Sequence, residues 1–94
     1  MSEFVAVAIH HVDPRYEHEM LEFMRRVIQA TEGEPGLIEF KACRELTTRV
    51  LAGYSRWNSR RDFEAGLGTI TSLSPQRKPE WTVRPDDILL LEDA

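Results

Sequence analysis

F-V-A-V-A-I-H-H-V, residues Phe4 to Val12, is the segment from which the architecture of this chain follows. Its β-branched and small apolar residues predict a β-strand, in which successive side chains point to opposite faces of a sheet. Both faces are apolar, one with Phe4, Ala6 and Ala8 and the other with Val5, Val7 and Ile9. Because a strand of this kind is buried on both sides, each face of its sheet needs a cover.

An amphipathic helix is predicted directly after this strand. Asp13 is suited to cap its N-terminus and Pro14 to be its first residue. Apolar residues then recur at spacings of three and four, the helical period, at Tyr16, Met20, Phe23, Met24, Val27 and Ile28. Gly33 is expected to end this helix, and residues 34–36 to connect it to the next strand.

The remaining elements follow from the same local rules. Alternating side chains predict strands, Ser59 is suited to cap a second helix, and sequence rich in Ser and Pro predicts a loop. The predicted ranges are a strand from Leu37 to Cys43, a polar hairpin connection from Arg44 to Thr48, a strand from Arg49 to Trp57, a helix from Arg60 to Leu67, a loop from Gly68 to Pro85 with a helical turn around Pro75 to Trp81, and a strand from Asp87 to Glu92.

This order, βαββαβ, predicts an α+β fold of the ferredoxin-like class, a single domain over residues 1–94. It is expected to have a four-stranded antiparallel sheet with two helices on one face. The second face is uncovered and apolar, because the first strand is apolar on both sides and the last strand carries leucine or isoleucine on both sides. A second copy of the same sheet is the simplest cover, so we expect a homodimer through this open face.

The composition limits the partners. The 94 residues are 41% hydrophobic and 30% charged, which is typical of a globular protein. A net charge of −4 gives no positive field for a nucleic-acid backbone, so no nucleic-acid partner is expected. The apolar runs are too short to span a bilayer and Ser-Glu follows Met1, so we expect no membrane partner and a cytoplasmic location.

The chain also offers few residues that could hold a cofactor. A single cysteine, Cys43, allows no intrachain disulfide or multi-cysteine metal cage, in keeping with a reducing compartment. Of the helical pairs, His18 and Glu22 have a chelating spacing, but they are expected to face solvent. We therefore expect no metal, flavin or haem.

Two short segments add to the order of elements. They are the link A-T-E-G-E-P-G-L, Ala30 to Leu37, and the corner W-N-S, Trp57 to Ser59. Together with the length and the element order, they resemble the antibiotic biosynthesis monooxygenase family over nearly the whole chain. The resemblance implies a ferredoxin-like protomer and a homodimer whose sheets face each other as a dimeric α/β barrel.

The resemblance also implies a chemistry. Characterised branches oxygenate electron-rich aromatic substrates, such as polyphenols and quinols, without metal or flavin, and the substrate supplies the electrons. Such a site needs a dry aromatic-walled pocket, a base that works near neutral pH and a donor that holds the resulting anion. On this resemblance the base is His10 or His11, and the donor is Tyr54 or Arg56. The candidate walls are Trp57, Phe23, Phe63 and Trp81.

The chain departs from two branches of that family. A haem-degrading branch uses an Asn on the first strand, a Trp within the second helix and a later His. Here the first strand has no Asn, Ala65 lies about where that Trp would fall, and no His follows His18, so haem degradation is disfavoured. A quinone-forming branch uses an Asn and a Tyr alongside a Trp, and the only Asn of this chain is Asn58, at the corner.

Strand geometry separates the candidates. His10 and His11 are neighbours and point to opposite faces, so at most one of them lines a pocket. Tyr54 and Trp57 also differ in parity, and Trp57 is either a pocket wall or only a packing residue at the strand-to-helix corner near Phe63.

A pocket is expected between the first helix and the sheet. Gly53 leaves room there, and the flexible Met20 and Met24 can adapt to a ligand. Two functions stay open: a cofactor-independent oxygenase of a small aromatic or quinol-like molecule, and a non-catalytic dimer that binds a small hydrophobic ligand or stabilises a partner. A His with a polar partner inside an enclosed pocket favours the first, and purely apolar filling favours the second.

Overall fold

Residues 2–94 are described by a computed structural model, and their elements follow the predicted order. The strands and long helices are β1 (Phe4–His10), α1 (Glu17–Thr31), β2 (Leu37–Arg44), β3 (Leu51–Trp57), α2 (Arg60–Ser72) and β4 (Asp87–Glu92). Short 3-10 turns add η1 (Pro14–Tyr16), η2 (Ser74–Gln76) and η3 (Pro79–Trp81). The predicted ferredoxin-like fold is confirmed.

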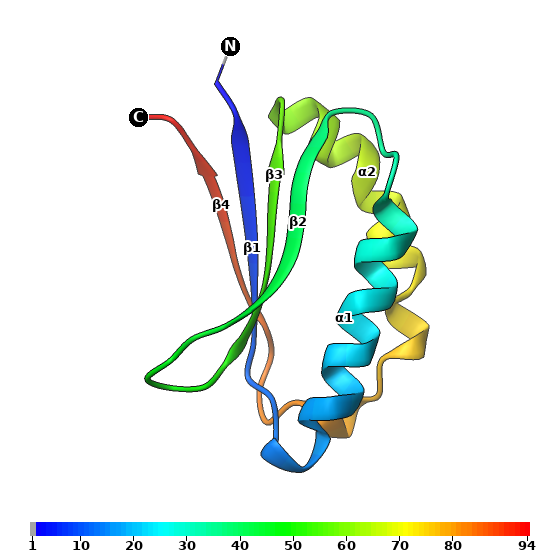
Figure 1. The fold of residues 1–94 in the computed structure, drawn as a ribbon, viewed down its shortest axis with the longest axis vertical. Helices are drawn as coiled ribbons and strands as arrows, with labels where there is room; N and C mark the ends of the chain where they lie inside the picture. Colours follow the sequence, from blue (N-terminus) through cyan, green and yellow to red (C-terminus); the bar gives the residue numbers. More distant parts are fainter. Residues whose placement is uncertain (1) are drawn as a thin grey trace.

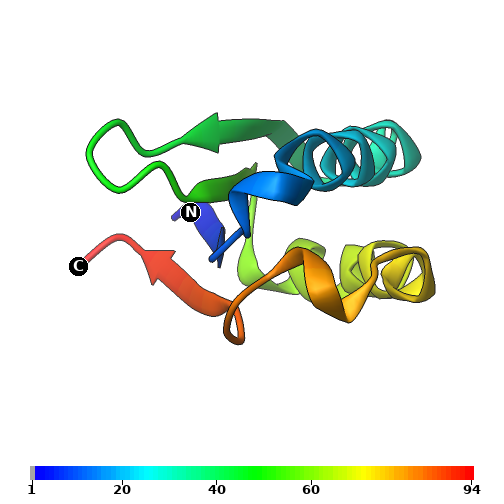
Figure 2. The same ribbon diagram turned by 90° about the horizontal axis from the view of Figure 1, so that it is seen from below.

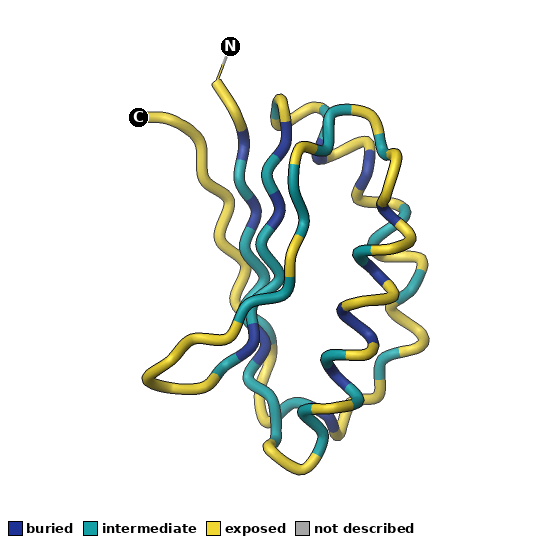
Figure 3. Tube along the Cα trace, in the orientation of Figure 1, coloured by how far each residue is buried: buried dark blue, intermediate teal, exposed yellow. Residues whose placement is uncertain are grey.

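The four strands form one antiparallel sheet in the order β2-β3-β1-β4, so β1 lies inside the sheet. Both helices lie on one side of it (Figure 1), and the view from below shows two layers (Figure 2). On β1, Phe4, Ala6 and His10 are buried, whereas the residues between them are half-buried. Phe4, Ala6 and His10 therefore face the helices, and the opposite side of the sheet is its open face. The edge strand β4 is exposed along its length (Figure 3).

Two strands are shorter than predicted. β1 ends at His10, and Val12 makes only an isolated bridge with Thr82, because the chain turns there toward α1. β3 begins at Leu51, since Arg49 has a φ of 66°, in the left-handed region that does not continue a strand. The predicted bounds of the other two strands hold to within one residue.

Helix α2 is longer than predicted, continuing past Leu67 to Ser72. Glycine, threonine and serine in this segment are weak helix formers, which is why the sequence favoured a loop. Ile70 packs against both buried clusters of the protein, so tertiary contacts outweigh the weak local propensity. The predicted helical turn in the following loop is present as the two short turns η2 and η3.

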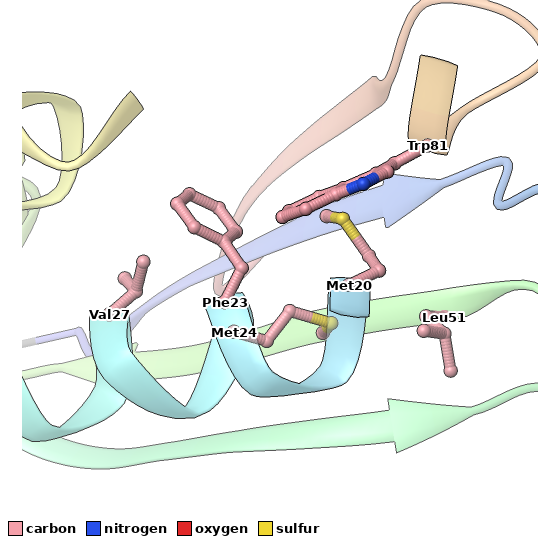
Figure 4. Packing of buried hydrophobic residues seen from close by; sticks show 6 residues of the cluster. All are labelled: Met20, Phe23, Met24, Val27, Leu51 and Trp81. Carbon is pink, nitrogen blue, oxygen red and sulfur yellow. The ribbon is translucent and has the colours of Figure 1, made fainter. Parts of the chain in front are cut away.

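The larger buried cluster joins α1 to the sheet and to the loop before β4. Less than one tenth of the surface of each member is exposed to solvent. The members are Met20, Phe23, Met24, Val27, Leu51 and Trp81 (Figure 4). The four members on α1, Met20, Phe23, Met24 and Val27, belong to the apolar stripe predicted for this helix, which confirms the helix face that the sequence assigned to the core.

Trp57 belongs to a second cluster at the corner between β3 and α2. It is fully buried, its Nε1 donates to Ser55 Oγ at 2.9 Å, and its ring meets Phe63 edge-on with centroids 5.8 Å apart. Gly66 of α2 lies against the same ring, because a Cβ at that position would stand 2.7 Å from Cη2. Trp57 therefore closes this corner as a packing residue.

The open face of the sheet has an apolar half and a polar half. On β1 and β4 it carries apolar side chains, Val5, Val7, Ile9, Leu89 and Leu91. On β2 and β3 it carries polar side chains, Glu39, Lys41, Tyr54 and Arg56. Leu89 and Leu91 are 45% and 49% exposed in the protomer, so the apolar half faces water. Among residues 2–94, no helix combines the length and apolarity needed to cross a bilayer.

Candidate functional site

A cavity of about 420 Å³ lies between the helices and the sheet. Phe23 and Val27 of α1 and Phe63 and Ile70 of α2 form its helix side. The side chains around it are mostly apolar, which suits the burial of a small hydrophobic molecule. This is the region between the first helix and the sheet in which the sequence predicted a pocket.

Small residues on the central strands make room for this cavity. Ala6 and Ala8 of β1 and Gly53 of β3 form part of its sheet side. A Cβ at Gly53 would stand 3.6 Å from the Phe40 ring and 4.0 Å from His10 Nε2, so the glycine leaves space beside the imidazole. Ile88 and Leu90 of β4 also line the cavity and remain 58% and 47% exposed, so it opens to solvent along β4.

The charged groups of the cavity gather at one end, around His10. This residue ends β1, is 8% exposed and turns its Nε2 toward Gly53. Its Nδ1 lies 3.1 Å from Asp86 Oδ2. The contact is close but lacks hydrogen-bond alignment, so the attraction is mainly electrostatic. A carboxylate therefore faces one nitrogen of the ring, while the other faces the apolar cavity.

Asp86 is itself held in position by Arg77. The guanidinium donates through both terminal nitrogens, at 2.5 Å to Oδ2 and 2.7 Å to Oδ1, which is bidentate geometry. Burial raises the pKa of the Asp86 carboxyl, but the contacts with Arg77 and His10 outweigh burial and hold this pKa well below its ordinary value. The hydrogen bond to Asp86 raises the pKa of Arg77. Asp86 is thus a fixed anion beside His10.

This arrangement is suited to moving a proton. An imidazole with a carboxylate beside Nδ1 is stabilised when it becomes positively charged, so its Nε2 can accept a proton from a bound molecule. The apolar surroundings lower the local polarity and so strengthen such electrostatic effects. Among the described residues, no group of three or more histidines, cysteines or acids is arranged to hold a metal ion.

The other predicted polar site residues lie away from this cavity. His11 is on the opposite side of the strand end, where its Nε2 is 2.7 Å from Asp87 Oδ2. Tyr54 and Arg56 project from the open face of the sheet. There Lys41 Nζ lies 5.4 Å from the centroid of the Tyr54 ring, and Arg56 pairs with acids at the surface. The structure does not bring these three side chains together with His10.

Of the four aromatic residues predicted as pocket walls, two line the cavity and two do not. Phe23 and Phe63 line the cavity. Trp57 is packed behind Phe63, and Trp81 lies beyond Phe23 with ring centroids 6.4 Å apart. Neither tryptophan is among the described residues that line the cavity.

Sequence reasoning missed Asp86 and Arg77. Arg77 lies in the segment predicted as a loop, and Asp86 lies between that loop and the predicted last strand, where no periodicity assigns a side chain to a face. A signal for Asp86 was present: an antiparallel pairing of the first and last strands brings the end of one beside the start of the other, and Ile9 does pair with Asp87. The adjacent pairs His10-His11 and Asp86-Asp87 then meet, one His–Asp contact on each side of the sheet.

Solved structures share this fold at low sequence identity. A conserved protein from Methanosarcina mazei Go1 has a TM-score of 0.84 at 19% identity, covering 97% of this chain and 92% of its own. A putative antibiotic biosynthesis monooxygenase from Nitrosomonas europaea has a TM-score of 0.82 at 15% identity, with coverages of 97% and 89%. A monooxygenase from the gene ActVA-Orf6 of Streptomyces coelicolor, in complex with the ligand nanaomycin D, has a TM-score of 0.73 at 19% identity, with coverages of 97% and 87%.

These similarities confirm at the level of fold the expected resemblance to antibiotic biosynthesis monooxygenases. No protein-family model matches the sequence, and no curated protein matches it either. At these identities the likeness concerns the fold, and the chemistry must be argued from the cavity.

Proposed function

We propose that this protein is a cofactor-independent oxygenase of a small phenolic or quinol-like aromatic molecule, with His10 as the general base. The observation that carries the proposal is one buried imidazole, next to a fixed carboxylate, at the end of an apolar cavity. A purely binding function needs only the apolar walls. The polar end of the cavity favours catalysis over binding alone, because a titratable imidazole enclosed in a pocket beside a charged partner is typical of functional sites.

The reaction balances with the substrate and O₂ alone. A phenol with a free para position and one O₂ give a quinone and one water. His10 Nε2 takes the phenolic proton, and the phenolate transfers one electron to O₂. The resulting radical and superoxide combine in a carbon–oxygen bond at the para carbon. The His10 imidazolium then gives its proton to the peroxide. Neutral His10 accepts the para C–H proton as the O–O bond breaks and hydroxide leaves, and it passes this second proton to the hydroxide, which becomes water.

Each protein group has a limited task in this scheme. Phe23 and Phe63 hold the ring, and Ala8 and Gly53 leave room for it beside Nε2. Asp86 stabilises the imidazolium that forms. Because Tyr54 and Arg56 project from the open face, His10 carries the acid–base work of the cavity in this proposal.

An oxygen-uptake screen of phenols and polyphenols that have a free para position tests this function. We expect turnover by the wild type, and a fall in kcat of about 10² to 10⁴ in His10→Gln, the range for loss of a general base. The matched control is His11→Gln, the neighbouring histidine with its own aspartate, which should keep wild-type turnover. Equal turnover in both variants would remove His10 from the mechanism. Tight binding without oxygen uptake would favour the non-catalytic alternative.

We further propose that the protein is a homodimer through the open face. The apolar half of that face, on β1 and β4, is larger than the scattered apolar residues of an ordinary surface. The same face of a second copy supplies a matching apolar strip under two-fold symmetry. Sedimentation at micromolar concentration should give twice the protomer mass of 10.9 kDa.

A further inference from the structure

A second, shallower hollow adjoins the charged end of the cavity. It has a volume of about 410 Å³ and lies among η2, η3 and the segment before β4. Ser74 and Arg77 line both the cavity and this hollow. The rest of the hollow includes Lys78, Thr82 and Arg84. The two spaces therefore adjoin at Ser74 and Arg77.

The charge of the hollow is opposite in sign to that of the protein as a whole. Arg77, Lys78 and Arg84 line it, and no acid of residues 2–94 does, although the chain carries a net charge of −4. Arg77 is already paired with Asp86, and Arg84 lies 3.7 Å from Asp87. No carboxylate in the described part of the chain forms an ion pair with Lys78. One positive charge is therefore left uncompensated at the hollow.

We propose that the substrate is an aromatic acid whose carboxylate binds in this hollow, at Lys78, while its ring and hydroxyl occupy the cavity. This inference rests on the proposed function and names its substrate class. A single uncompensated charge matches a singly charged carboxylate better than a doubly charged phosphate. The hydroxyls of Ser74 and Thr82 offer further donors at the same place.

The two ends of such a ligand have separate partners. The hydroxyl end meets His10 beside Asp86, and the carboxylate end meets Lys78 on the other side of Arg77. Because Arg77 stays paired with Asp86, binding the carboxylate does not require that ion pair to break. The arrangement favours one orientation of the ligand. In the reverse orientation the carboxylate would enter the apolar cavity, where it would lose its hydration without gaining a free cation.

The test compares 6-hydroxy-2-naphthoic acid with its methyl ester, which has the same ring and hydroxyl but no charge. Dissociation constants are measured by fluorescence titration at pH 7 and low salt. We expect the acid to bind the wild type about tenfold more tightly than the ester, the order of a charge-assisted contact at the surface. Lys78→Gln should remove this preference and leave the affinity for the ester unchanged. The matched control is Arg61→Gln, the same charge change at the exposed start of α2.

The outcomes separate this inference from the proposed function. Equal binding of acid and ester by the wild type would overturn the carboxylate site and leave the aromatic cavity intact. Equal loss of the preference in Lys78→Gln and Arg61→Gln would also overturn it, because the effect would then be one of net charge. Binding of neither compound would overturn both the inference and the aromatic cavity on which it rests. A preference that disappears only in Lys78→Gln supports the site.

Discussion

Replacing Gly66 by Ala should destabilise the protein, although alanine is the better helix former. Gly66 lies in the middle of α2, buried against the ring of Trp57. The added methyl would stand 2.7 Å from Cη2 and 2.9 Å from Cζ3 of that ring. Carbon atoms normally rest about 3.5–4.0 Å apart, so the overlap is about 0.8 Å or more. Trp57 cannot withdraw easily, because it is fully buried and its Nε1 is bound to Ser55.

The expected change in the free energy of unfolding of Gly66→Ala follows from three effects. Alanine in place of glycine favours the helix by about 1 kcal/mol. Overpacking costs about 1–3 kcal/mol, and displacing the Trp57 ring from Ser55 costs about 1 kcal/mol more. The net loss in free energy of unfolding is therefore about 1–3 kcal/mol. Each kcal/mol lowers Tm by about 4–8 °C in a domain of this size.

Gly68→Ala is the matched control. It lies in the same helix two positions later, is exposed, and a Cβ there has no heavy atom within 4 Å. This variant should gain about 1 kcal/mol from helix propensity alone. Thermal and urea denaturation of both variants, at one protein concentration, give the comparison. Gly66→Ala as stable as Gly68→Ala would refute the close packing of α2 on Trp57.

Two further predictions concern the charged end of the cavity and the open face. The pKa of Asp86 is lower in the folded protein than in the unfolded chain, so its stabilisation is present above about pH 4 and is lost as pH falls through the folded value. The difference in unfolding free energy between wild type and Asp86→Asn should therefore shrink between pH 6 and pH 3 in urea titrations, and an unchanged difference would contradict the contact with Arg77. Val7→Asp puts a charge on the apolar half of the open face, opposite Leu89, and should abolish the dimer in sedimentation, whereas Leu46→Asp, 85% exposed in the hairpin, should not.

The sequence predicted the fold well because β1 and α1 carry strong local patterns. The α1 stripe matches its buried face, and β4 has the predicted bounds. The end of α2 could not be predicted in this way. Ile70 holds the last turns of that helix against two clusters assembled from other elements, and a local propensity scale contains no such contact.

The site was only partly predictable for a related reason. Strand parity showed that His10 and His11 face opposite ways, but both faces of β1 are apolar, so the pattern alone did not indicate which one the helices cover. The side of β1 that the helices cover also decides the position of Tyr54. Tyr54 pairs with Val7 and therefore lies on the open face with it. Arg77 pairs with Asp86 because the irregular loop between them brings the two side chains together. No periodic pattern in the sequence predicts the conformation of such a loop.

The most direct test of the proposed chemistry is the ionisation state of a phenol bound beside His10. A coloured phenol such as 4-nitrophenol, whose anion absorbs at longer wavelength than its neutral form, is titrated into the protein at a pH where the free compound is mostly protonated. We predict that the wild type binds it as the phenolate, because the proton moves to His10 next to Asp86, and that His10→Gln binds it as the neutral phenol. The same spectrum for the bound compound in both proteins would contradict the assignment of His10 as the base.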